Sequence, residues 1–235
     1  MADKSGAPPR VSLTFDDGPG ERTDELLDLL ARENVPATFF LLGANAERHP
    51  EVVGRMRNLQ GIEVANHSTT HQDLTTVGRK GVVAEIQRTN QILDDLAGPW
   101  TGYVRPPWGR HDPVVRDVAR VQGHPLILYS LDCRDWSHHS TIETIRIVTE
   151  NAVDGDIVLL HDTLGTTVDA VAKIIEGLRR RGFRFLTVSA LLGETVPGQA
   201  YYGRVSSVVS TRRWISAQVL LWRRRFQRLL GRGLR

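Results

Sequence analysis

The stretch VSLTFDDGPG, residues 11–20, joins an apolar run to two adjacent carboxylates. The run over 11–15 predicts a buried strand, and Gly18-Pro19 predicts a turn directly after it. Asp16 and Asp17 fall where the strand gives way to the turn. A turn alone accounts for an Asp-Gly pair. Two carboxylates at a strand end also suit a site in which one holds a metal and the other moves a proton.

The rest of the chain alternates between predicted strands and helices. Short apolar segments that predict strands lie at 11–15, 37–43, 62–66, 102–105, 125–131, 156–161 and 183–188. Amphipathic helical stretches separate most of them, at 22–32, 82–96, 141–152 and 167–180. This alternation is typical of an α/β protein with a parallel sheet, either an open doubly wound sheet or a closed barrel.

Polar clusters favour the barrel. They lie at or just after the C-terminal ends of predicted strands, at Asp16/Asp17, His67, Arg105, Asp132/Asp135 and His161/Asp162. In a barrel those strand ends converge on one mouth, where active sites are built from several strands. In an open sheet they would be spread along an edge and meet only near a switch point.

Composition excludes several classes of protein. The 235 residues include one cysteine, Cys133, so no intramolecular disulfide can form and no oxidising compartment is needed. The first ten residues, MADKSGAPPR, lack the apolar segment of a signal peptide, and no apolar run is long enough to span a bilayer. We therefore expect a soluble, cytoplasmic protein. An extracellular or cell-envelope location is the expectation if an export segment has been removed.

The basic character of the chain is concentrated in its last residues. Residues 204–235 contain nine arginines and no Asp, Glu or Lys, which leaves 21 basic and 27 acidic residues in 1–203. We predict a catalytic domain over 1–203, without a nucleic-acid partner, and an Arg-rich amphipathic tail over 204–235. Apolar residues at helical spacing within 212–235 predict a helix that packs on its own domain, on an anionic membrane surface or on another protein.

The segment NHSTTH places His67 and His71 four residues apart. On a helical turn, positions i and i+4 share one face, which suits two imidazoles on one metal. Two histidines with one carboxylate leave coordination positions open for water and substrate. The spacing is weak evidence alone, and the aspartates and His161-Asp162 strengthen it.

Three further segments carry candidate chemistry. In RPPWG, the two prolines stiffen the backbone and aim either Arg105 or the Trp108 N–H, although a stiff loop with a surface arginine fits the same pattern. In DCRDW, two aspartates three residues apart precede Trp136. In IVLLHD, an apolar strand ends in His161, which is a candidate proton donor if a carboxylate partners it.

In this order, TFDDGP, HSTTH, RPPWG, DCRDW and IVLLHD resemble the five motifs of the polysaccharide deacetylases, carbohydrate esterase family four. The resemblance extends over about residues 10–192. It implies a distorted (β/α)7-type barrel with the active site at the C-terminal ends of the strands. It also implies a metal-dependent hydrolase that removes the N-acetyl group from N-acetylglucosamine-type sugars, in a polymer or an oligomer.

The resemblance also implies a role for each motif residue. Asp16 would be the general base, paired with Arg105, and His161 would be the general acid, held by Asp135. The metal ligands would be Asp17, His67 and His71, usually for Zn²⁺, with Co²⁺ or Mn²⁺ in related enzymes. The Trp108 N–H would stabilise the oxyanion, and Trp136 and Leu159 would line the acetyl pocket.

Other residues depart from the family pattern or carry no motif role. Tyr129 stands where many members have Trp, and Asp132 has no settled role. His138 and His139 are expected to be solvated loop residues. The alternatives for function are O-deacetylation of a polysaccharide such as xylan, and N-deacetylation of a small amino sugar. A non-catalytic sugar-binding protein on the same fold would show eroded motifs, and none is eroded here.

Overall fold

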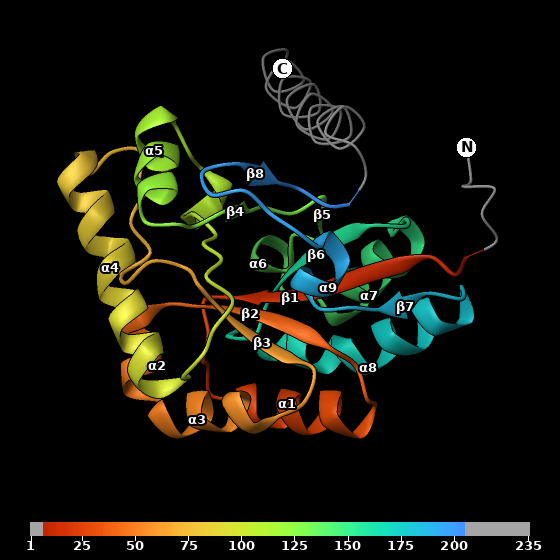
Figure 1. Ribbon diagram of the computed structural model, residues 1–235. Coiled ribbons are helices and arrows are strands. Elements are labelled where there is room, and N and C mark those ends of the chain that lie inside the picture. Colours follow the sequence, from red (N-terminus) through yellow and green to blue (C-terminus); the bar gives the residue numbers. More distant parts are fainter. Residues whose placement is uncertain (1–6, 205–235) are drawn as a thin grey trace, which may run out of the picture.

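A computed structural model describes residues 7–204, and the predicted tail lies outside the described residues (Figure 1). The central sheet is parallel, in the order β3-β2-β1-β6-β5. Its strands are β1 (Arg10–Asp16), β2 (Ala37–Leu41), β3 (Ile62–Asn66), β5 (Leu131–Asp132) and β6 (Asp156–His161). Strand β7 (Arg184–Phe185) pairs with the start of β1. The predicted α/β parallel fold is confirmed.

The sheet curls towards a barrel through short strands. Strands β4 (Leu126–Ile127) and β8 (Ala200–Tyr201) pair with each other and lie above the central sheet in Figure 1. Val104 forms single bridges to Asn66 at the end of β3 and to Leu126 in β4, which connects the two sheets. The result is the distorted barrel that the sequence predicts.

Two predicted strands differ from the observed ones. The segment 102–105 contributes only the bridge at Val104, because Gly102 has a φ of 71° and the chain turns there. The segment 125–131 is two strands, because the chain changes partners within it. The Leu128 N–H donates to the Tyr201 carbonyl in β8. The Ser130 N–H, two residues later, donates to the Ile157 carbonyl in β6.

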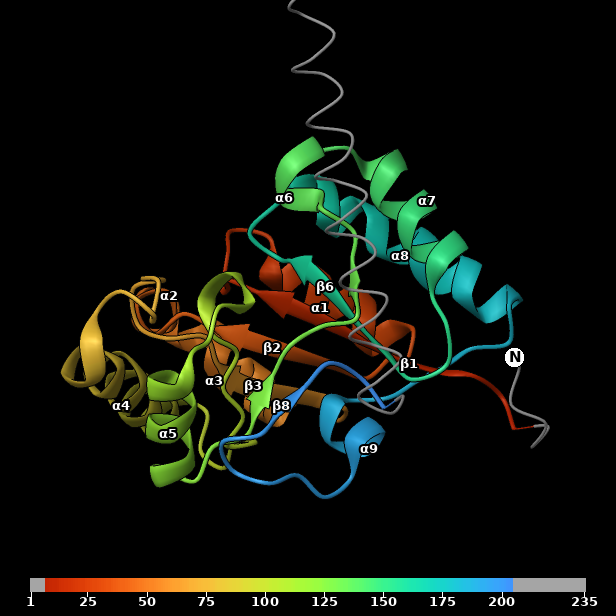
Figure 2. The ribbon, with the colours of Figure 1, turned by 90° about the horizontal axis from the view of Figure 1, so that it is seen from above.

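Helices cover the outside of the barrel (Figure 2). They are α1 (Thr23–Arg32), α2 (Gly43–Arg48), α3 (Pro50–Asn58), α4 (Gly78–Leu96), α5 (Pro113–Val121), α6 (Asp135–His138), α7 (Thr141–Asn151), α8 (Gly165–Arg180) and α9 (Val188–Leu192), with a 3-10 turn, η1 (Pro107–Gly109). Side chains cap two of these helices at their N-termini: the Val115 N–H donates to the Asp112 side chain, and the Glu143 N–H donates to Ser140. Within residues 7–204, no helix has the length and hydropathy needed to cross a membrane.

Period-2 alternation decides which side chains enter the barrel. In β1, Val11, Leu13 and Phe15 pack in the apolar core with residues of the surrounding helices, and the Phe15 ring stacks on Phe39 at 5.0 Å between centroids. The intervening residues of β1, which end at Asp16, are therefore the inward set. The register pairs Asp16 with His161 across β1 and β6. Asp16 and His161, two of the predicted site residues, are therefore neighbours on adjacent strands at the barrel mouth.

Candidate active site

Arg105 fixes Asp16 inside the barrel mouth. Its side chain is completely buried, and the guanidinium lies over the Phe40 ring at 3.8 Å. The Nη1 atom donates to Asp16 Oδ1 at 2.6 Å and to Thr14 Oγ1 at 2.9 Å. The Nε and Nη2 atoms donate to the backbone carbonyls of residues 127 and 128, both at 3.0 Å. Asp16 is therefore held as a buried carboxylate beside a fixed positive charge.

Asp17 turns away from Asp16 because its backbone is left-handed, with a φ of 72°. Its Oδ1 atom lies 3.4 Å from His67 Nε2 and 3.3 Å from His71 Nε2. Candidate ligand atoms from these three residues all lie within 4.8 Å of one another. The predicted ligand residues are therefore brought together.

The donor set fits a cation. The Oδ1 atom of Asp17 is buried, and no hydrogen bond reaches it from the described residues. Burial works to raise the Asp17 pKa, but the neighbouring imidazole of His67, 3.4 Å away, outweighs it together with smaller effects of His161 and His71, and the pKa is lowered to about 2. The His67 Nδ1–H donates to the Arg105 carbonyl at 2.7 Å, which leaves the Nε2 lone pair facing Asp17. One carboxylate and two imidazoles are typical ligands of Zn²⁺.

The prediction that His67 and His71 share a helical turn is wrong. Residues 67–71 form a loop, in which Ser68 and His71 have φ values of 69° and 61°. Glu85 of α4 anchors this loop: its Oε2 atom accepts from the N–H groups of Thr69 and Thr70, both at 2.9 Å. The two imidazoles therefore meet through a left-handed loop held by a carboxylate, rather than along a helix face.

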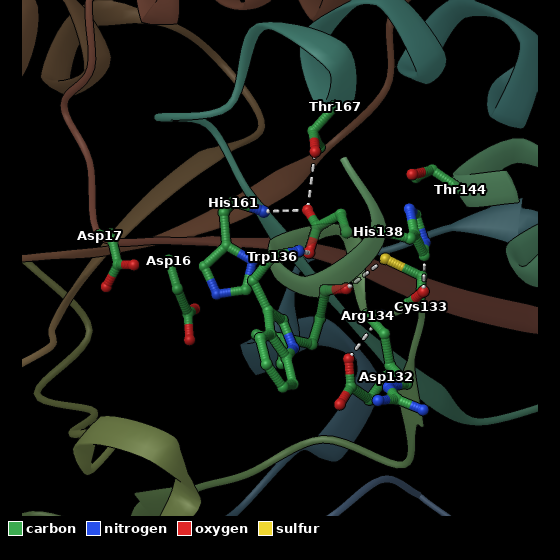
Figure 3. A network of polar contacts seen from close by, with 12 residues as sticks. Asp16, Asp17, Asp132, Cys133, Arg134, Trp136, His138, Thr144, His161 and Thr167 are labelled. Atoms are coloured by element: carbon green, nitrogen blue, oxygen red, sulfur yellow. Dashed lines mark hydrogen bonds and ion pairs between the residues drawn. The ribbon is translucent and has the colours of Figure 1, made fainter. Parts of the chain in front are cut away.

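His161 forms the opposite side of the site (Figure 3), and Asp135 holds it through hydrogen bonds. The His161 Nδ1–H donates to Asp135 Oδ1 at 2.8 Å, and the His161 backbone N–H donates to Oδ2 at 2.9 Å. Thr167 and the Trp136 N–H also donate to this carboxylate. Burial works to lower the pKa of His161, but the hydrogen bond to Asp135 outweighs it and raises the pKa to about 9. His161 is therefore protonated at neutral pH, and its Nε2 faces Asp16 (Figure 3).

Two exposed tryptophans flank this centre. Trp108, in η1, has a left-handed φ of 54° and meets the His71 ring edge-on at 4.5 Å between centroids. Trp136 is the second residue of α6 and lies beside His161 (Figure 3). Leu159 is buried two residues before His161, and the inward alternation of β6 places both on one face. The residues predicted to line the acetyl pocket thus lie at the rim and floor of the site.

The structure also shows supporting residues that sequence reasoning did not assign. Glu85 and Thr167 stand on helices, where periodicity gives no signal that they support a loop or a carboxylate. His138 was expected to be a solvated loop residue, and this is wrong. Its Nδ1 accepts from the Ser140 N–H, and its Nε2–H donates to the Cys133 carbonyl, both at 3.0 Å, so it fastens the turn that carries Asp135. Asp132 accepts from the Arg134 N–H at 2.7 Å.

The fold and this arrangement define an α/β barrel protein with a candidate two-histidine, one-carboxylate metal site at its mouth. The chain belongs to the polysaccharide deacetylase family, whose family model, "Polysaccharide deacetylase", matches residues 3–127.

Relatives that are named deacetylases support this membership. The chain is 36% identical over 200 residues to the peptidoglycan-N-acetylglucosamine deacetylase of Listeria monocytogenes, covering 84% of this chain but only 42% of that protein. It is 37% identical over 191 residues to the chitooligosaccharide deacetylase of Sinorhizobium fredii, covering 74% of this chain and 88% of the relative. A solved structure described as "T48 deacetylase with substrate" superposes with a TM-score of 0.79 at 37% identity, covering 83% of this chain and 96% of the other.

Proposed function

We propose that this protein is a metal-dependent deacetylase that removes the N-acetyl group from N-acetylglucosamine-type sugars, in a polymer or an oligomer, to give the free amine and acetate. The observation that carries the proposal is the opposition of Asp16 and His161 beside the cluster of Asp17, His67 and His71. The names of the Listeria and Sinorhizobium relatives support the sugar class.

The metal proposed for the cluster is Zn²⁺, held by Asp17, His67 and His71, with Co²⁺ or Mn²⁺ as alternatives. Zn²⁺ binds imidazole nitrogen and carboxylate oxygen, and a three-ligand site leaves a coordination position open. When bound, such an ion lowers the pKa of a water ligand towards about 7 and polarises a carbonyl oxygen.

Asp16 is the proposed general base. Its Oδ1 atom accepts a hydrogen bond from Arg105 Nη1 at 2.6 Å, and its Oδ2 atom lies 3.6 Å from His67 Nε2. It therefore sits next to the ligand cluster without being one of the three proposed ligands. In the proposed reaction, Asp16 takes the proton of the water that attacks the acetamide carbonyl.

The remaining groups act on the intermediate and on the leaving group. The Trp108 N–H is the proposed donor to the oxyanion, and losing such a donor typically costs about 100- to 1000-fold in turnover. His161, kept protonated by Asp135, gives its Nε2 proton to the leaving amine, which departs poorly as an anion. Trp136 and Leu159 are proposed to enclose the acetyl methyl.

Acetate release from chitin oligomers, peptidoglycan, acetylxylan and small N-acetyl amino sugars tests the proposal. We expect release from N-acetylglucosamine-containing substrates, its loss after chelation, and its return with Zn²⁺ or Co²⁺. Full activity of the chelated protein would overturn the metal-dependent reaction. Release from acetylxylan alone would replace N-deacetylation with O-deacetylation, and activity confined to small sugars would remove the polymer from the proposal.

A further inference from the structure

Asp162 is a buried carboxyl that the proposed reaction does not use. It follows His161 directly, in the turn after β6, and its side chain lies against Gly18 and Thr23. It is 1% exposed, and its Oδ1 atom has no hydrogen-bond partner among the described residues. Burial raises the pKa of this carboxyl to about 7. Burying a carboxyl with an unpaired oxygen costs stability, so its contribution must come from what it contacts.

The Asp162 carboxyl faces the backbone of Gly18. A Cβ atom added to Gly18 would overlap the whole group, at 2.5 Å from Oδ1 and 2.7 Å from Cγ. Gly18 has an ordinary φ, so the restriction here is one of space rather than of backbone conformation. Only a glycine lets the turn lie flat on the Asp162 side chain. The contact is one residue away from Asp17, the predicted carboxylate ligand.

A hydrogen-bond chain ties the same turn to Asp162. The Gly20 N–H donates to Thr23 Oγ1 at 2.8 Å, and Thr23 Oγ1 donates to Asp162 Oδ2 at 2.5 Å. Thr23 is buried and opens α1, so the chain runs from the turn through a helix start to β6. Asp162 therefore contacts the turn twice, at Gly18 by close packing and at Gly20 through Thr23.

The opposite side of the turn is held by the segment after β2. The Leu42 N–H donates to the Gly18 carbonyl at 3.1 Å, and Asn45 Nδ2 donates to the Asp17 carbonyl at 2.6 Å. The left-handed Asp17 is thus clamped between this segment and Asp162. Removing one side of the clamp leaves the backbone free to relax from its unfavourable φ of 72°.

We propose that Asp162 is a positioning residue whose side chain fixes the backbone at Gly18 and thereby aims Asp17 at the metal. The inference rests on the proposed function, because it takes Asp17 as a metal ligand. Its basis is shape and hydrogen bonding at Gly18 and Thr23, rather than charge. A neutral side chain of the same shape will therefore replace Asp162, and a smaller one will not.

Zinc affinity of the metal-free protein, measured by competition with a chromophoric chelator, tests this role without any substrate. We expect Asp162→Ala to weaken zinc binding about 10- to 100-fold, the usual effect of removing a group that orients a ligand. Asp162→Asn keeps an acceptor for Thr23 and should bind zinc close to the wild-type level. Unchanged affinity in Asp162→Ala, beside a wild type that binds zinc, would overturn the inference. A wild type that binds none of Zn²⁺, Co²⁺ and Mn²⁺ would overturn the proposed function instead.

Asp156 supplies the matched control. It lies at the opposite end of β6, is 2% exposed, and accepts from Ser130 Oγ at 2.7 Å. We expect Asp156→Ala to lower the unfolding temperature while leaving zinc affinity unchanged. Equal losses of zinc affinity in Asp156→Ala and Asp162→Ala would show that general destabilisation explains the effect, and would contradict the positioning role.

A double-mutant cycle tests the contact between Gly18 and Asp162 directly. Gly18→Ala should weaken zinc binding because the new methyl group overlaps the Asp162 carboxyl. Adding Asp162→Ala removes the overlapping atoms, so the double variant should bind zinc more tightly than Gly18→Ala alone. Residues in contact show such non-additivity. Additive losses from the two substitutions would overturn the proposed contact.

Discussion

The two sides of the site are built by different means. On the side of the candidate metal ligands, Asp17, His71 and Trp108 all have left-handed backbones, with φ values of 72°, 61° and 54°. On the opposite side, His161 ends a regular strand and is oriented by two hydrogen bonds to Asp135. Non-glycine residues in that left-handed region cost about 1–3 kcal/mol each and persist only where the surroundings hold them. The left-handed residues on the ligand side include two of the candidate ligands themselves, whereas His161 lies in a regular strand and is oriented by one carboxylate.

The largest effect should come from removing a ligand. We expect His71→Ala to lose zinc binding in the chelator competition and to lose acetate release with it. His71 is only partly buried and lies on a loop, so the circular dichroism spectrum should remain that of the wild type. If His71→Ala bound zinc normally, His71 would not be a ligand. The left-handed loop would then have no part in holding the metal.

Asp16→Asn separates the base from the ligands. The amide keeps the shape of the carboxylate but cannot take a proton, so we expect turnover to fall by about 100- to 10,000-fold with zinc affinity retained. The buried Arg105 also loses its counter-charge, so the unfolding temperature should fall. Loss of zinc in this variant would show that the roles of Asp16 and Asp17 are reversed.

Asp135→Asn probes the His161 side through pH. The His161 pKa of about 9 lies above the usual value of about 6.5, so kcat/KM should fall on the alkaline side near pH 9. In the variant this fall should move to lower pH, with about a 100-fold loss of turnover at neutral pH. NMR titration of the imidazole measures the shift directly.

The same substitution should also change how the free energy of unfolding depends on pH. A pKa raised on folding contributes stability that is complete below about pH 6.5 and is lost as pH rises through about 9. Asp135→Asn should therefore reduce the free energy of unfolding most between about pH 4 and 6.5, where the carboxyl is ionised and His161 is protonated, and less above pH 9. An unchanged alkaline limb in Asp135→Asn would show that the carboxylate does not set the state of His161.

The smallest effect should come from a loop support. Glu85→Ala removes the acceptor of the Thr69 and Thr70 N–H groups, so we expect zinc affinity to fall about 10-fold. Glu47→Ala is the control, since Glu47 pairs with Arg88 on the surface and contacts no ligand loop. If both variants bound zinc equally well, the loop would hold its left-handed backbone without help from Glu85.

The sequence predicted where the polar side chains of the site lie better than it predicted the backbone conformation of the segments between them. Period-2 alternation and strand-end placement located Asp16 and His161, because those rules depend only on neighbouring residues. They missed the loop at 67–71, since nothing in NHSTTH indicates a left-handed histidine. They also missed the split between β4 and β5, because it depends on distant partners at Tyr201 and Ile157. Glu85 and Thr167 gain their roles only through tertiary contact.

Arg105 has a consequence for how the chain folds. Its guanidinium donates to side chains of β1 and to the carbonyls of residues 127 and 128. These two segments lie about a hundred residues apart in the sequence. A partly folded chain that had docked only one of these segments would bury an unsatisfied guanidinium, at a cost of several kcal/mol. Barrel closure and the assembly of the Asp16 environment should therefore occur as one cooperative event, so that intermediates with a closed barrel but a disordered mouth are rare.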